Sequence, residues 1–172
     1  MASLLGSCTG GNSDAATRTA ARILANIHDQ VVGTPIVIER HVGTVTAVAV
    51  LYYNGCMDNL IGRMWGHGQA SGIYAVRSAA TSSEQIQVLD SSRSLQVFYA
   101  PAPTARVSWT ISSATIDSMS LHAGWGILID ANTFALQPET GRGILTGYSK
   151  SSKQTAQQAL PTGHSLAKGC VG

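Results

Sequence analysis

The stretch that decides the fold is PIVIERHVGTVTAVAVLYYNG, residues 35–55. Two runs rich in Val, Ile, Thr and Tyr flank a break at Gly43, and the second run ends at Asn54 and Gly55. β-Branched and aromatic residues favour strands, whereas Gly and Asn favour turns. The stretch therefore predicts two consecutive strands joined by a short turn.

Further short runs of the same character follow, each bounded by Gly, Pro, Asn, Asp or Ser. They are SGIYAVRS (71–78), EQIQVLD (84–90), SLQVFYA (94–100), ARVSWTISS (105–113), HAGWGILID (122–130) and GRGILTGYS (141–149). Short strands separated by turn residues are typical of antiparallel sandwiches and barrels. We expect a mainly β protein, an antiparallel β-sandwich over residues 34–160. TAQQAL (155–160) fits a helical turn or a last strand, and residues 161–172 form a tail.

Residues 12–33, NSDAATRTAARILANIHDQVVG, differ from the rest of the chain because their apolar positions recur every three or four residues. Ser13 suits an N-cap, and Gly33 suits the left-handed residue that ends a helix. We expect an N-terminal amphipathic α-helix here. A chain of 172 residues fits one domain, so we predict a single domain over residues 1–172.

Only 12% of the residues are charged and the formal net charge is +2, without a basic stripe, which disfavours nucleic acid as a partner. The three cysteines, Cys8, Cys56 and Cys170, lack metal-ligand spacing. They fit buried free thiols or, alternatively, a link between Cys8 and Cys170. We expect no metal and no cofactor. The start MASLLGSCTGG has no positively charged region and is not a secretory signal peptide.

His67 and His122 lie beside glycine or alanine, and Asp58, Asp117 or Asp130 could orient an imidazole for acid–base chemistry. No HExxH motif or paired carboxylate accompanies them. We therefore expect a protein that is not an enzyme and keep a histidine-based enzyme as an alternative.

The expected helix allows two interpretations: a helix that lines a pore, or a surface helix docked on a sheet. A helix of ~19 residues, from Asp14 to Val32, is about 28 Å long, close to the ~30 Å hydrocarbon thickness of a bilayer. As one helix in a ring of helices, it could turn its polar face towards a water-filled lumen. The alternative is a surface helix docked on a sheet by its apolar residues. The candidate pore-helix residues are Arg18, Arg22, Ile23, Leu24, Ile27 and Asp29.

Aromatic residues gather at the predicted strand ends. Tyr and Trp at such places suit a ligand or membrane interface, because they are apolar with one polar group. Core aromatics near the end of a sandwich would give the same pattern. The candidate binding residues are Tyr52, Tyr53, Asn54, Tyr99, Pro101 and Trp109.

The order of these features resembles the actinoporin-like pore-forming cytolysins. ARILANIHDQVV followed by TPIVIERHVGTVTAVAVLYYNG is similar to the helix and first two strands of that family. SLQVFYAPAP is similar to its strand that enters a proline-containing, lipid-facing loop, and RGILTGYSKSSKQTAQQAL to its last hairpin. The resemblance covers about residues 13–160. It implies a β-sandwich with an amphipathic N-terminal helix.

We therefore expect a membrane-binding, pore-forming protein that binds a lipid or glycan surface, assembles as a homo-oligomer and lines a pore with its N-terminal helix. It would be secreted or released and would act at target membranes. The alternative is a self-assembling structural or lectin-like β-sandwich, such as a small coat or decoration protein, which the low charge and hydroxyl-rich composition also favour.

Overall fold

The computed structural model describes residues 14–28, 30–66, 69–78, 85–92, 94–121, 123–132 and 141–160. The chain divides into two compact units: the first comprises Met1–Ala79 with Leu166–Gly172, and the second Ala80–Ser165. The single domain expected from the sequence stays a prediction.

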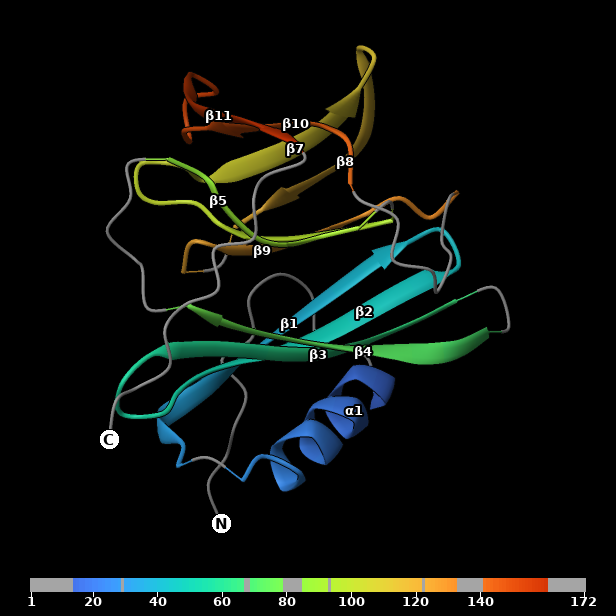
Figure 1. Ribbon diagram of the computed structural model, residues 1–172, viewed down its shortest axis with the longest axis vertical. Helices are drawn as coiled ribbons and strands as arrows, with labels where there is room; N and C mark the ends of the chain where they lie inside the picture. The colour runs from blue at the N-terminus through green and yellow to red at the C-terminus, as the bar shows by residue number, and fades with distance from the viewer. Residues whose placement is uncertain are drawn as a thin grey trace. The chain divides into compact units, whose positions relative to one another are not determined.

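The first unit is a helix on an antiparallel sheet. Helix α1 (Asp14–Ala25) precedes strands β1 (Val32–Val42), β2 (Val45–Tyr53), β3 (Asp58–Gly66) and β4 (Gln69–Ser78). The strands pair in the order β1-β2-β3-β4. Figure 1 shows α1 lying along one face of this sheet. Residues 35–55 thus form a hairpin, in which Val42 faces Val45 across the turn at Gly43.

Helix α1 is docked by an apolar cluster. Ala20 and Ile23 are buried against Val48 and Val50 of β2. Further partly buried side chains pack against this cluster: Leu24, Ile27, Val37, Ile61 and Trp65. Arg18 and Arg22 are exposed on the opposite side of the helix. In the structure as it stands, the helix is therefore a surface helix docked on a sheet.

The helix is shorter than the sequence pattern predicted, and this corrects the expected span of residues 12–33. It has 12 residues, about 18 Å, and ends at Ala25. The cause is Asn26, whose side-chain amide donates to the Arg22 carbonyl at 2.8 Å. The Asn26 and Ile27 backbone amides bond three residues back instead of four, which closes the last turn. Ile27 lies beyond the helix, and Asp29 lies outside the described residues.

Gly33 has a positive φ of 79°, as the sequence suggested, but it lies inside β1. The pairing of β1 with β2 shifts between Val32 and Ile36, so Gly33 belongs to a strand irregularity. Its left-handed backbone serves a bend of β1 and not a helix end.

The turn between β2 and β3 carries an exposed cysteine that forms a disulfide. The Asn54 carboxamide oxygen accepts hydrogen bonds from the Cys56 and Met57 backbone amides, which fixes this turn. Cys56 is disulfide-bonded. This corrects the expectation of a buried free thiol. Within one chain the partner must be Cys8 or Cys170, which lie outside the described residues, and either choice excludes a bond between those two.

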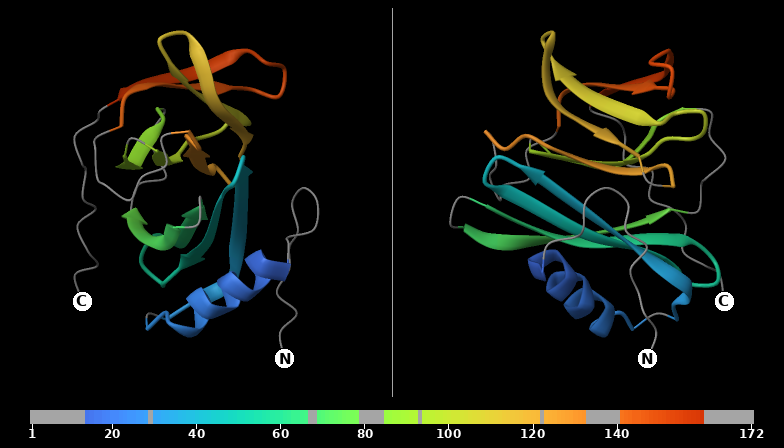
Figure 2. Two further views of the ribbon diagram at one scale, coloured as in Figure 1. Left: turned by 90° about the vertical axis from the view of Figure 1, so that its right-hand side faces the viewer. Right: turned by 180° about the vertical axis from the view of Figure 1, so that it is seen from behind.

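The second unit is a small β-sandwich. One sheet contains β5 (Gln87–Ser91), β6 (Leu95–Tyr99) and β9 (Trp125–Ile129), in the order β5-β6-β9. The other contains β7 (Arg106–Ile111), β8 (Ala114–Ser120), β10 (Gly143–Tyr148) and β11 (Gln154–Leu160), in the order β11-β10-β7-β8. All their pairings are antiparallel. Figure 2 shows these two sheets as separate layers.

The core of the sandwich joins both sheets. Phe98 and Leu128 from the three-stranded sheet pack in one cluster with Val107, Trp109 and Leu145 from the four-stranded sheet. A side chain of β8 also accepts a hydrogen bond from the backbone of β9, the last strand of its sheet. The Asp117 carboxylate accepts a hydrogen bond from the Ile129 amide at 3.0 Å. Asp117, one of the carboxylates considered for orienting a histidine, therefore has a structural role.

The expected fold class is confirmed: the protein is mainly β, with antiparallel sheets, a β-sandwich and an N-terminal amphipathic helix. TAQQAL belongs to β11 and is a strand. Strands β3 and β8 were not among the strands predicted from the sequence. Among the described residues, no helix combines the length and the apolar character needed to cross a membrane.

Candidate ligand pocket

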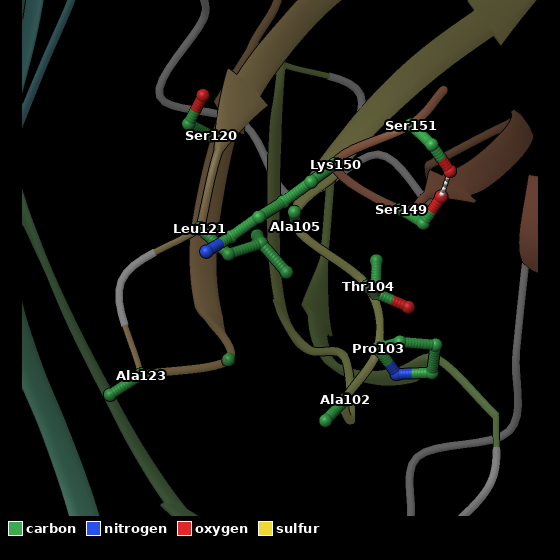
Figure 3. Close-up of a pocket in the computed structure, with 11 residues that line it drawn as sticks. Ala102, Pro103, Thr104, Ala105, Ser120, Leu121, Ala123, Ser149, Lys150 and Ser151 are labelled. Atoms are coloured by element: carbon green, nitrogen blue, oxygen red, sulfur yellow. Dashed lines mark hydrogen bonds between the residues drawn. The ribbon is translucent and has the colours of Figure 1, made fainter. Parts of the chain in front are cut away.

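A pocket of about 800 Å³ lies in the second unit. Three chain segments line it: residues 102–105 after β6, residues 120, 121, 123 and 124 from the last residue of β8 towards β9, and residues 149–151 between β10 and β11. Figure 3 shows most of these side chains around the opening. The volume lies within the range of ~300–1,000 Å³ that is usual for small-ligand sites.

The first wall is the proline loop that follows β6. Pro cannot donate to a sheet ladder, so the pairing of β6 ends before Pro101. The Ala100 amide then donates to the Gly124 carbonyl at 2.7 Å, and the Thr104 amide closes a turn on the Pro101 carbonyl at 3.0 Å. The peptide bond between Ala102 and Pro103 is cis. These bonds hold the loop against the second wall, at Gly124.

Ala105 joins all three walls through its backbone. Its amide donates to the Tyr148 carbonyl at 2.8 Å, and its carbonyl accepts from the Leu121 amide at 2.9 Å. The hydroxyl groups of Thr104 and Thr155 are hydrogen-bonded at 2.8 Å. Gly147 leaves room for this pair, because a Cβ there would lie 2.9 Å from Thr104 Cγ2 and from Thr155 Oγ1. The pocket is therefore built into the sandwich by backbone bonds.

The third wall is the turn between β10 and β11. The Ser149 amide donates to the Lys153 carbonyl, and the Ser152 amide donates to the Ser149 carbonyl. Ser152 has a positive φ of 63°, which this turn requires. The hydroxyl groups of Ser149 and Ser151 lie 2.9 Å apart. Small hydroxyl side chains thus crowd one side of the opening.

The charge at the pocket is positive. Lys150 is exposed, and in the view of Figure 3 its side chain extends across the opening towards Leu121. The described part of the chain offers Lys150 no ion-pair partner. Arg106 stacks over the Tyr148 ring, 4.9 Å from the ring centroid, next to the lining residue Ala105. Among the described residues that line the pocket there is no Asp or Glu. An anionic or hydroxyl-bearing ligand suits this arrangement.

Two of the predicted binding residues, Tyr99 and Pro101, lie next to the pocket and are partly exposed. The Tyr99 ring packs edge-on against Trp125, with ring centroids 5.5 Å apart at 67°. A Cβ on Gly124 would lie 2.5 Å from the Tyr99 ring, so Gly124 fits tightly over it. Tyr99 supports the second wall from behind, and neither residue lines the pocket itself.

Trp109 and Tyr52 require a correction, because both are buried. Trp109 is 0% exposed in the sandwich core, and its indole N–H donates to the Arg142 carbonyl at 2.8 Å. Tyr52 is 8% exposed in the first unit. In the folded chain neither ring is part of a contact surface, so these two residues follow the alternative interpretation of core aromatics.

Tyr53 and Asn54, two further candidate binding residues, belong to the first unit. Tyr53 is 42% exposed and pairs across the sheet with Val32, which is 44% exposed. Asn54 is partly exposed and uses its carboxamide oxygen within its own turn. The candidate binding residues that are not buried thus divide into Tyr53 and Asn54 in the first unit and Tyr99 and Pro101 beside the pocket in the second.

One further polar cluster lies on the β1–β2 hairpin. His41 Nε2 lies 2.5 Å from a Glu39 carboxylate oxygen, and His41 Nδ1 lies 2.8 Å from the Thr46 hydroxyl. The imidazole is 55% exposed. Within the described ranges, no group of three or more His, Cys, Asp or Glu residues could hold a metal ion. His67 and His122, the candidates for an enzyme, lie outside the described residues.

The polar residues that line the pocket, chiefly Lys150 with Ser149, Ser151 and Thr104, were not among the predicted site residues. A usable signal was present, because YSKSSK (148–153) places two lysines among serines directly after a strand. What the pattern lacks is any sign that this turn lies beside the proline loop.

Comparisons with known proteins give no relatives: no family model matches the chain, and neither curated proteins nor solved structures show a significant similarity. The resemblance to the actinoporin-like cytolysins stays a prediction.

Proposed function

We propose that the protein is a non-enzymatic, membrane-binding protein that docks on lipid headgroups through the pocket of its second unit. The observation that carries the proposal is the pocket itself, which the proline loop, the β8–β9 loop and the β10–β11 turn build together. A lipid headgroup is a small polar group, and the size and lining of this pocket suit such a group. Tyr99 and Pro101 beside it add apolar surface for the interfacial region.

We further propose that the protein then oligomerises and forms a pore with its N-terminal segment. Helix α1 is amphipathic and is held to its sheet by a small cluster around Ile23. At about 18 Å it is shorter than a bilayer, so lining a pore requires residues 26–32 to extend it. Ile27 and Val31 continue its apolar pattern. Arg18, Arg22 and Asp29 would then face the lumen.

The disulfide at Cys56 supports action outside the cell. Disulfides persist in oxidising surroundings and are rare in the cytosol. This agrees with a protein that is secreted or released before it meets its target membrane.

Dye release from liposomes tests the proposal. Vesicles of several headgroup compositions should leak at least for one composition, and the protein should co-sediment with those vesicles. Absence of both binding and leakage across compositions would overturn the proposal. A narrower test uses the ion selectivity of single channels. Arg22→Glu should shift selectivity towards cations, whereas unchanged selectivity would remove the helix from the lumen.

A self-assembling structural protein is the second candidate, and strand β11 favours it. This seven-residue strand ends its sheet and carries neither a charge nor a proline in QTAQQAL. Natural edge strands are usually protected by such residues, because open edges pair with other chains. Gln157 is exposed on β11. On this hypothesis Gln157→Lys should abolish large assemblies in sedimentation velocity experiments, and vesicles should not leak.

A further inference from the structure

The residues that line the pocket in the second unit determine which headgroup the pocket can bind. Lys150 supplies a positive charge that is exposed and has no ion-pair partner in the described part of the chain. Thr104, Ser120, Ser149 and Ser151, which carry hydroxyl groups, also line the pocket. The Thr104 hydroxyl is paired with that of Thr155, and the Ser149 hydroxyl with that of Ser151. Hydroxyls and an ammonium are hydrogen-bond donors to an anion. The pocket therefore offers several donors and one full positive charge.

The same lining disfavours two other classes of ligand. A quaternary ammonium such as choline is usually held by aromatic faces, and sugars commonly stack on aromatic rings. No aromatic residue is among the described residues that line the pocket. The nearest rings, Tyr99 and Trp125, pack against each other behind Gly124. A choline group would also meet the like charge of Lys150.

The surroundings add to the positive field. Arg106 lies over Tyr148, whose carbonyl holds Ala105 in the pocket wall. Lys153 is exposed in the same turn as Lys150 but does not line the pocket. The buried carboxylate of Asp117 is engaged by the Ile129 and Ser118 amides. An anion approaching this rim would be attracted by neighbouring cations.

We propose that the pocket selects a phosphate ester that carries no quaternary ammonium, with Lys150 as its counter-charge and the surrounding hydroxyls as hydrogen-bond donors. The lipid with this chemistry is phosphatidic acid, and glycerol 3-phosphate is its soluble counterpart. A phosphate has three acceptor oxygens that can meet these donors together. The remaining volume accommodates the glycerol. This inference rests on the proposed function and names the headgroup class of the same site.

The test compares Lys150→Ala with the matched control Lys153→Ala, since both remove one positive charge from the same exposed turn. Binding is measured to vesicles of phosphatidylcholine alone and of phosphatidylcholine mixed with phosphatidic acid. The wild-type protein should bind the mixed vesicles and should bind pure phosphatidylcholine weakly. Lys150→Ala should weaken binding to the mixed vesicles by about tenfold or more, the effect of a lost charge-assisted hydrogen bond. Lys153→Ala should cost about fivefold or less, from diffuse attraction alone.

Calorimetric titration with glycerol 3-phosphate separates the pocket from the membrane. The wild-type protein and Lys153→Ala should bind it, Lys150→Ala should not, and Lys150→Arg should restore most of the binding. Equal losses for Lys150→Ala and Lys153→Ala, or equal binding to both kinds of vesicle, would overturn the inference and leave membrane binding standing. Lys150-dependent binding of glycerol 3-phosphate without binding to any vesicle would support the pocket chemistry and overturn the proposed function. If the protein binds neither vesicles of any composition nor glycerol 3-phosphate, both the inference and the proposed function are overturned.

Discussion

At the scale of single residues, Trp109 shows how one side chain can be assigned to a surface or to a core. Its ring is fully buried, and the indole N–H is used by the Arg142 carbonyl. Trp109→Phe keeps most of the apolar volume and leaves that carbonyl without its donor. We expect the free energy of unfolding to fall by about 1–3 kcal/mol in urea denaturation, with vesicle binding unchanged. Lost binding at unchanged stability would instead return Trp109 to the binding surface.

Asp58, at the start of β3, is a residue whose charge opposes folding. Burial raises the pKa of its carboxyl above the ordinary value of 3.8. The folded chain therefore holds the proton more strongly than the unfolded chain does, and the stability contributed by this group falls as pH rises through and above 3.8.

Asp58→Asn removes this titration. The variant should be at least as stable as the wild-type protein near neutral pH, and its advantage should shrink as the pH falls towards 3.8 and be lost below it. Urea denaturation across this range gives the comparison. A wild-type protein that gains stability over the variant as pH rises would contradict the raised pKa.

At the scale of elements, the docking of α1 links stability to the proposed pore. Ile23 is buried in the cluster with Val48 and Val50, so Ile23→Ala should lower the free energy of unfolding by about 2–4 kcal/mol. If the helix must leave the sheet, the same change should speed dye release from vesicles. Thr17→Ala, on the exposed side of the helix, is the matched control and should leave both quantities unchanged. Slower or unchanged release with Ile23→Ala would argue against helix release.

The strands show what the sequence could and could not predict. The apolar runs around β2 and β6 were readable, because β-branched residues and turn signals bound them. Strand β3 was missed because Asp58, Asn59 and Arg63 interrupt its apolar pattern. Strand β8 was missed because it follows a two-residue turn of Ser112 and Ser113, both with positive φ, where glycine or asparagine is the usual signal.

The candidate site was predictable only in part, for a reason of geometry. The proline loop was identified from Tyr99 and Pro101, since a strand must stop there. Lys150 lies some fifty residues away in sequence, and tertiary contacts such as the backbone bonds of Ala105 to Tyr148 and Leu121 bring the three segments together. Periodicity within one segment holds no information on such a contact. The end of α1 was misjudged for a similar reason, because the apolar pattern continues through Ile27 while Asn26 ends the helix.

At the scale of the whole molecule, the three cysteines and the disulfide at Cys56 make a prediction that can be counted. One intramolecular disulfide leaves a single thiol. Unreduced protein in denaturant should therefore react with one equivalent of a thiol reagent, and reduced protein with three. The bond should stabilise the folded chain by about 2–4 kcal/mol, so reduction should lower the melting temperature.

Cys8→Ser and Cys170→Ser then identify the partner, because each variant serves as the control for the other. Replacing the free cysteine should leave no thiol in the unreduced protein and no change in melting temperature. Replacing the partner should leave two thiols and should lower the melting temperature as reduction does. Three thiols in unreduced wild-type protein would show that the bond is absent in solution, and would remove the support that it lends to action outside the cell.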